Sequence, residues 1–195
     1  MSTVLQSSKS NEWYTPDHVI DRVRDTLGTI ELDPASCPDA NAVVGADRFF
    51  GRGGGVEDGL SVPWEADTLF TNPPYGVDEN HKSNVWKWST YLFDQWQKGN
   101  VDSAILLTFA HPSRQWFYPF WNFPICFLWK RIKFRRSDGS KGSSPPHCNA
   151  ITYLPGKDDA DFSMFYDAWQ DAGHIVDPIK QGNRSIGDYT TRDFL

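Results

Sequence analysis

Short apolar runs alternate along this 195-residue sequence with segments whose apolar residues recur at helical spacing. The run at 103–109 is nearly continuous in its apolar character, as in a parallel strand buried on both faces. The other expected strands are residues 30–33, 68–71, 125–129 and 149–154. Strands that alternate with helices build a mostly parallel, twisted sheet with helices on both faces. The sequence therefore predicts an α/β fold of Rossmann-like type.

The expected helices have recognisable ends. The first is predicted to begin with Thr15 as N-cap and Pro16 in the first helical position, and to end at Gly28. Its buried stripe would consist of Val19, Ile20, Val23 and Leu27. A second helix, with Val85, Trp88, Leu92 and Trp96 on its buried face, should stop near Gly99. Residues 113–120 and 161–172 are further helix candidates.

Length and composition favour one folded domain. A chain of 195 residues with 39% hydrophobic and 15% aromatic residues can bury a sizeable core. We expect residues 1–12 to be a flexible tail and residues 13–195 to form a single domain. The three cysteines show neither metal-ligand spacing nor a disulfide framework, which favours a reducing cytoplasm. The longest nonpolar stretch, 117–129, contains prolines and is too short to span a membrane.

Charge is unevenly distributed along the sequence. The formal net charge is −6, which by itself weakens the case for a nucleic-acid partner. A cluster of cations nevertheless lies in one short segment, consisting of Lys130, Arg131, Lys133, Arg135, Arg136 and Lys141. A local basic strip on an acidic body is compatible with binding DNA phosphates, or with a solvated charged loop.

Two polar residues are expected at the ends of strands. Asp33 ends the first expected strand, and Asn72 follows the second. Parallel sheets bind ligands in the crevice outside the carboxyl ends of their strands. We therefore expect Asp33 and Asn72 to lie beside a ligand site.

The segment Asn72-Pro73-Pro74-Tyr75 suits chemistry at a planar amine. The exocyclic nitrogen of such an amine is a poor nucleophile because its lone pair is delocalised. The side-chain oxygen of Asn72 and the backbone carbonyl of Pro73 can accept hydrogen bonds from its two N–H groups. The prolines stiffen the turn, and Tyr75 offers an aromatic face on which a base can stack. The alternative is a rigid turn without a ligand.

These residues belong to a series of blocks that resembles the Dam-type N6-adenine DNA methyltransferases of phages and prophages. The blocks span roughly Trp13 to Leu154 and occur in the family's order. They are Trp13–Pro16, Leu32–Ser36, Asn41-Ala42, Arg48–Phe50, Asp58–Leu60, Trp64, Asn72–Gly76, Arg131–Phe134 and Ser144–His147. The resemblance implies a class I methyltransferase fold, S-adenosylmethionine as cofactor, and methyl transfer to N6 of a flipped-out adenine in DNA. It also implies the cytoplasm of a bacterium or of a phage-infected bacterial host.

The same resemblance indicates which residues hold the cofactor. They are Tyr14, Thr15, Pro16, Asp33, Pro34, Ala35 and Asp58. Asp33 would accept from the methionine ammonium and Asp58 from the adenine amine, while the helix start near Thr15 would favour the carboxylate. Phe49 or Phe50 would contact the adenine ring, or both would be core residues. Each Asp has a simpler reading as a loop acid that caps a turn. The usual glycine-rich loop after the first strand is absent, and the glycines come later, at 51 and 53–55.

The expected DNA contacts are Lys130, Arg131, Lys133, Arg135 and Arg136, with Lys82 and Arg114 as outliers. Loop 77–84 is a candidate to close over a flipped base. His147 is either a lining residue or a surface residue. No metal site is expected, because the histidines do not cluster with cysteine or aspartate at ligand spacing. Most tryptophans are expected in the core.

Three alternatives stay open. The same tetrapeptide occurs in methyltransferases that act on the glutamine amide of proteins, and related turns serve cytosine N4. A third alternative is a non-catalytic nucleic-acid-binding relative with the same fold. The DNA recognition sequence and the oligomeric state are not encoded in any of these patterns.

Overall fold

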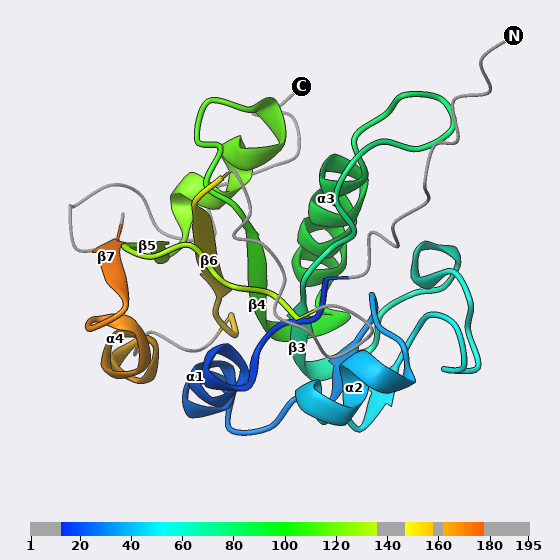
Figure 1. Ribbon diagram of the computed structural model, residues 1–195, viewed down its shortest axis with the longest axis horizontal. Helices are drawn as coiled ribbons and strands as arrows, with labels where there is room; N and C mark the ends of the chain where they lie inside the picture. Colours follow the sequence, from blue (N-terminus) through cyan, green and yellow to red (C-terminus); the bar gives the residue numbers. More distant parts are fainter. Residues whose placement is uncertain (1–12, 136–146, 158–161, 178–195) are drawn as a thin grey trace, which may run out of the picture.

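The computed structural model describes residues 13–135, 147–157 and 162–177. Within these ranges the strands form one sheet in the order β2-β1-β3-β4-β6-β5-β7 (Figure 1). Their bounds are β1 Leu32–Asp33, β2 Arg48–Phe49, β3 Ala66–Thr71, β4 Val101–Phe109, β5 Ile125–Leu128, β6 Asn149–Leu154 and β7 Gly173–Val176. Strands β1 to β5 run in one direction, and β6 and β7 run against them. The expected Rossmann-like architecture is confirmed, with a mixed sheet in which three strand pairings are parallel and three are antiparallel.

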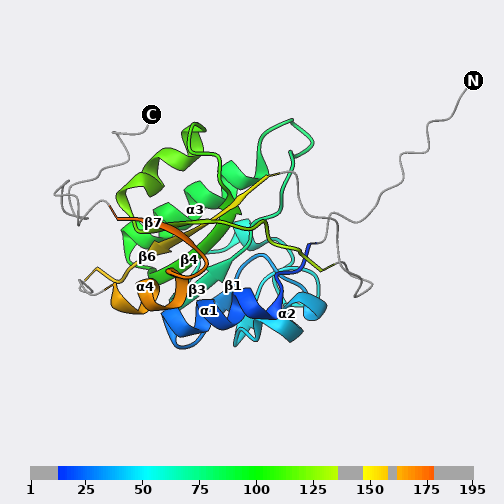
Figure 2. The ribbon, with the colours of Figure 1, turned by 60° about the vertical axis from the view of Figure 1, so that its left-hand side comes forward.

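Helices cover both faces of the sheet, as Figure 2 shows. The helices are α1 Asp17–Leu27, α2 Pro38–Val44, α3 Asn84–Lys98 and α4 Ser163–Trp169, with 3₁₀ helices η1 Gly59–Ser61 and η2 Gln115–Asn122. Side chains alternate along β4, so Ile105 and Leu107 pack with α1 and α4, while Ala104 and Leu106 pack with α3 and η2. Two hydrophobic cores result, one on each side of the sheet.

The start of α1 differs from the expectation in an informative way. Pro16, not Thr15, is the N-cap residue, and no side chain caps the helix. The Thr15 hydroxyl instead accepts a hydrogen bond from the side chain of Asn72. The predicted capping role of Thr15 is therefore wrong. A tertiary contact uses the hydroxyl that a local cap would have used.

The other predicted helices and strands lie close to their expected ranges, and the structure contains further elements that were not predicted. The helix expected at 113–120 is the 3₁₀ helix η2, and the one expected at 161–172 is shorter, as α4. The sequence patterns did not reveal α2, β2 or β7. Among the described residues, no helix is long and apolar enough to cross a membrane. Residues 1–12, expected to be a tail, lie outside the described ranges.

The carboxyl ends of β1, β3 and β4 meet at one edge of the sheet. The register pairs Leu32 with Leu69 and Thr71 with Leu106, so Asp33 and Asn72 emerge on neighbouring strands. After β5 the chain runs along this edge and reaches Tyr14, with which Arg135 forms an antiparallel bridge (Figure 1). The fold thereby gathers the first, middle and late blocks of the sequence at one edge.

Candidate functional site

A cavity of about 260 Å³ lies at this edge of the sheet. Its walls come from the segment before α1, the loop after β1, the loop between β2 and η1, and the turn after β3. The residues expected from the sequence that line it are Tyr14, Thr15, Asp33, Pro34, Ala35, Asp58, Asn72, Pro73, Pro74 and Tyr75. Pro16 stands at the N-cap of α1 and does not line the cavity. The volume is slightly below the range of about 300–1,000 Å³ typical of small-molecule pockets.

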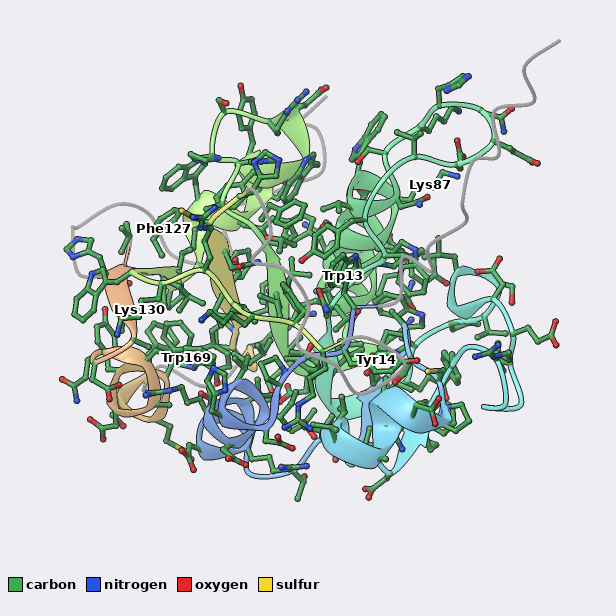
Figure 3. The ribbon with its side chains drawn as sticks, viewed as in Figure 1. Trp13, Tyr14, Lys87, Phe127, Lys130 and Trp169 are labelled. Carbon is green, nitrogen blue, oxygen red and sulfur yellow. The ribbon has the colours of Figure 1, made fainter. Side chains whose placement is uncertain are left out.

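The side-chain amide of Asn72 is held in one orientation. Its Nδ2 donates to the backbone carbonyl of Trp13 at 3.4 Å and to Oγ1 of Thr15 at 3.3 Å. Figure 3 shows Trp13 and Tyr14 on the segment that leads into α1. Because the nitrogen is used on that side, Oδ1 is the atom left to accept from another group.

Tyr75 forms a hydrogen bond with that oxygen. Its hydroxyl donates to Oδ1 of Asn72 at 3.0 Å, and its ring stacks on Phe109 with centroids 4.0 Å apart and an interplanar angle of 22°. Burial raises the pKa of the Tyr75 hydroxyl well above its ordinary value, so this group stays a donor. Phe109, at the end of β4, is a partner of the turn at 72–75 that no motif indicated.

Two histidines pack behind Phe109. The ring centroid of His147 lies 5.0 Å from that of Phe109, His111 lies 5.6 Å away, and the two imidazoles meet edge to face at 4.6 Å. Burial, together with the nearby charges of His147 and Arg114, lowers the pKa of His111. His147 therefore contacts the aromatic group beside the turn and does not line the cavity.

Asp33 is a buried carboxyl at the cavity wall. It is 3% exposed, and its Oδ1 accepts from the backbone N–H of Ala35 at 3.1 Å. Burial raises its pKa to about 7, against the opposing effect of that hydrogen bond. No Lys or Arg of the described ranges forms an ion pair with it. A positively charged ligand group would favour its ionised form.

Asp58 is an exposed residue of the cavity lining. Its side chain caps η1, because Oδ1 accepts from the N–H of Leu60 at 3.0 Å. The simpler reading of Asp58 as a turn-capping acid is therefore correct, and the residue also lines the cavity. Phe50 lines the cavity as well, whereas its neighbour Phe49 does not.

Glycines from a later part of the chain shape the loop after β1. Gly51 has φ of 127°, and a Cβ there would lie 1.9 Å from the carbonyl oxygen of Ser36. A Cβ at Gly59 would lie 2.2 Å from the carbonyl oxygen of Pro34. Both glycines line the cavity. Gly51 and Gly59, which lie outside the loop after β1, therefore allow the backbone to approach that loop closely.

The lining of the cavity is acidic. Asp33, Glu57 and Asp58 contribute carboxylates, and no Lys, Arg or His of the described ranges lines the cavity. The remaining walls include apolar and aromatic groups such as Phe50, Phe70 and Trp88. Such a lining suits a ligand that carries positive charge and an aromatic ring. It disfavours phosphate groups, which need cationic or N–H-rich surroundings.

The basic segment outside the cavity alternates in burial. Ile132 and Phe134 are 4% and 2% exposed, while Arg131, Lys133 and Arg135 face solvent. The segment is fixed to the sheet edge through the N–H of Ile132, which donates to Oδ1 of Asn149 at 3.3 Å. Lys130 is exposed, and Arg135 also pairs with Asp17 at the start of α1. Arg136 and Lys141 lie outside the described residues.

The loop after the turn at 72–75 is a small hairpin. Val77 and Ser83 form an antiparallel bridge, and the Asp78 carboxylate accepts from the N–H groups of Asn80 and Lys82 at 2.9 and 2.8 Å. Lys87 pairs with the same carboxylate and lowers its pKa. None of the hairpin residues lines the cavity. Its expected closure over a base stays a prediction.

Comparison with known proteins adds little to these observations. No family model matches the chain, and no match is found among curated proteins. The chain is similar to a solved structure titled 23S rRNA methyltransferase ErmE, with 14% identity, a TM-score of 0.47, and coverage of 76% of this chain and 71% of that chain. What the cavity binds therefore has to be inferred from its own residues. Among the described residues, no group of three or more His, Cys, Asp or Glu is arranged to hold a metal ion.

Proposed function

We propose that this chain transfers a methyl group from S-adenosylmethionine to the exocyclic N6 amino group of an adenine flipped out of DNA. The observation that carries the proposal is the fixed amide of Asn72, whose Oδ1 holds an O–H donor at 3.0 Å. An exocyclic amine can take the place of that donor. Its nitrogen then becomes more electron-rich, because its N–H groups point at protein acceptors.

The cavity fits the proposed cofactor on charge. S-Adenosylmethionine carries an ammonium and a sulfonium, and the cavity presents three carboxyl groups, of which Asp33 has a pKa of about 7, without a facing cation among the described residues. Asp33 would accept from the ammonium, Asp58 from the adenine amine, and Phe50 would contact the ring. The start of α1 beside Thr15 would favour the carboxylate. A dinucleotide, the other common ligand of Rossmann-like folds, would bring phosphates to an acidic wall.

The bound cofactor would supply an electrophilic methyl group on a cationic sulfur, which leaves as a neutral thioether. The chain's own residues bind and orient the acceptor. Asn72 and the Pro73 carbonyl accept from the amine, and the prolines hold them in place without reorganisation. Tyr75 supplies a stacking surface. The amine loses its proton to solvent, because an amide oxygen is too weak a base to take it.

The position of the exposed cations favours a nucleic-acid substrate. Lys130, Arg131 and Lys133 are exposed on the segment that runs along the same sheet edge as the cavity. Exposed cations outside the cavity can bind the phosphates of a nucleic acid whose backbone stays on the protein surface. One flipped-out base can then enter the cavity. DNA is proposed over RNA on the sequence resemblance.

The test is methyl transfer from labelled S-adenosylmethionine to a panel of acceptors. The panel contains adenine-rich duplex DNA, the same duplex with every adenine replaced by 2-aminopurine, ribosomal RNA, and a glutamine-containing protein extract. Label in the adenine duplex, recovered as N6-methyladenine after hydrolysis, is the expected result. Label confined to cytosine, RNA or protein would overturn the choice of acceptor. Absence of cofactor binding by calorimetry would overturn the methyltransferase proposal itself.

A further inference from the structure

The Asn72 amide poses a problem of orientation. Its carbonyl oxygen and its amino group have nearly the same shape, and rotation by half a turn exchanges them. Only the arrangement with Oδ1 toward the incoming amine accepts a hydrogen bond from it. With Nδ2 in that place, two donors would face each other. The proposed reaction therefore needs a feature that selects one orientation.

The Trp13 carbonyl on the segment before α1 makes that selection, and the Thr15 hydroxyl adds a second contact that holds the selected orientation. The carbonyl oxygen of Trp13 can only accept, so the atom of Asn72 that faces it at 3.4 Å must be the nitrogen. The second contact is Oγ1 of Thr15, at 3.3 Å from the same nitrogen. Thr15 is 4% exposed, so water does not readily replace this contact. The two acceptors together use both N–H groups of the amide.

The segment that carries these acceptors is itself braced. Tyr14, between them, exchanges two backbone hydrogen bonds with Arg135, each 2.9 Å long. Pro16 follows with a fixed φ of −74°, and α1 begins directly after it. The position of the Thr15 hydroxyl is thereby set by the late basic segment on one side and by a helix on the other.

We propose that Thr15 is a positioning residue that, with the Trp13 carbonyl, holds Asn72 in the orientation needed for methyl transfer. This inference rests on the proposed function, since it assigns Thr15 a part in the same reaction. It differs from the role in cofactor binding that the sequence resemblance implied for Thr15. The two roles predict different kinetics.

The test compares Thr15→Val, which keeps the shape and loses the hydroxyl, with Thr15→Ser, which keeps the hydroxyl. Loss of one buried hydrogen bond that orients the acceptor should lower the single-turnover rate at saturating cofactor and DNA by roughly tenfold in Thr15→Val. The cofactor Kd should stay within about twofold of wild type, and Thr15→Ser should recover most of the rate. A raised cofactor Kd with an unchanged rate would overturn the inference in favour of cofactor binding. Equal slowing by both variants would also overturn it, in favour of packing alone.

A second readout does not depend on activity. The side-chain NH₂ resonances of Asn72, assigned through their loss in Asn72→Ala, report the hydrogen bonds of Nδ2 directly. They should shift in Thr15→Val and return toward their wild-type positions in Thr15→Ser. Resonances that do not move in Thr15→Val would refute the positioning role. If wild-type protein methylates no acceptor, the proposed function fails, and the resonances still show whether Thr15 holds Asn72.

Discussion

The hydroxyl of Tyr75 donates a hydrogen bond of 3.0 Å to Oδ1 of Asn72, the atom proposed to accept from the target amine. The turn thus satisfies its own acceptor while no substrate is bound. Because an amide oxygen has two lone pairs, an incoming amine competes with the phenol where both approach the oxygen from the same side. The Tyr75 hydroxyl also marks where a donor can stand relative to Asn72.

Tyr75→Phe tests this competition. The variant keeps the ring that stacks on Phe109 and removes the competing donor. A neutral hydrogen bond contributes about 0.5–1.5 kcal/mol, so the KM for DNA should fall by about two- to tenfold with methyl transfer retained. Steady-state kinetics over DNA concentration provide the measurement. Tyr118→Phe, at an exposed tyrosine of η2, is the matched control. A large loss of rate in Tyr75→Phe would show that the hydroxyl takes part in the reaction.

Tyr75→Ala tests the ring. Stacking of a base on an aromatic side chain contributes about 1–3 kcal/mol, so kcat/KM for DNA should fall by about 5- to 150-fold. The cofactor Kd, measured by calorimetry without DNA, should change much less. Full activity in Tyr75→Ala would remove the ring from any contact with the base.

The buried carboxyl of Asp33 predicts a pH-dependent stability. Its pKa is raised from 3.8 in the unfolded chain to about 7 in the fold by burial. The stability is therefore fully present below about pH 4 and is lost as the pH rises toward 7, because the unfolded state ionises first. Asp33→Asn should remove this decline. Denaturant unfolding of both proteins between pH 4 and 8 measures it, with Asp39→Asn, on the exposed side of α2, as control. Parallel curves for wild type and Asp33→Asn would contradict the raised pKa.

Gly51 and Gly55 form a matched pair for the loop packing. Both have positive φ, at 127° and 84°, but only Gly51 has a backbone oxygen, that of Ser36, in the place of a Cβ. Gly51→Ala should be less stable than Gly55→Ala by about 1–3 kcal/mol, because the loops must separate. It should also weaken cofactor binding, since Gly51 lines the cavity. Urea unfolding and calorimetry measure the two effects. Equal stability of the two variants would show that the loops separate without cost.

The basic segment predicts a salt dependence. Removal of one cation that binds a phosphate lowers the slope of log Kd against log salt by about 0.9, so Arg131→Gln with Lys133→Gln should lower it by nearly two. Fluorescence anisotropy with labelled duplex DNA at several salt concentrations measures the slope. Lys98→Gln, at the end of α3 and at the opposite edge of the sheet, is the control. An unchanged slope in the double variant would place the DNA elsewhere on the surface.

The sequence is most informative where a motif coincides with a strand end. Asp33 and Asn72 are predicted at strand ends beside a ligand site, and both line the cavity. Periodicity also indicates α1, α3 and β4, because long buried elements leave a regular apolar pattern. The two-residue strand β2 and the seven-residue α2 are too short to leave such a pattern.

The contacts of the site are less accessible to sequence reasoning, since they join residues far apart in the chain. Thr15 matches a local helix cap, yet its hydroxyl contacts Asn72, 57 positions away. Gly51 resembles an ordinary loop glycine, and its close neighbour is Ser36. Phe109 ends an apolar run, and nothing in that run indicates stacking on Tyr75. Local patterns report local structure, whereas these roles depend on tertiary packing.

Asn72→Ala removes the side-chain acceptor on which the proposed methyl transfer depends. The variant should bind S-adenosylmethionine with a Kd close to that of wild type, because the proposed cofactor contacts are made by other residues. Single-turnover transfer of labelled methyl to adenine in duplex DNA should fall by at least about 100-fold, as when a key acceptor or donor is removed from a reacting group. Asn122→Ala, at the end of η2 and away from the cavity, should retain wild-type transfer. Transfer by Asn72→Ala at a rate near wild type would show that Asn72 does not activate the target amine.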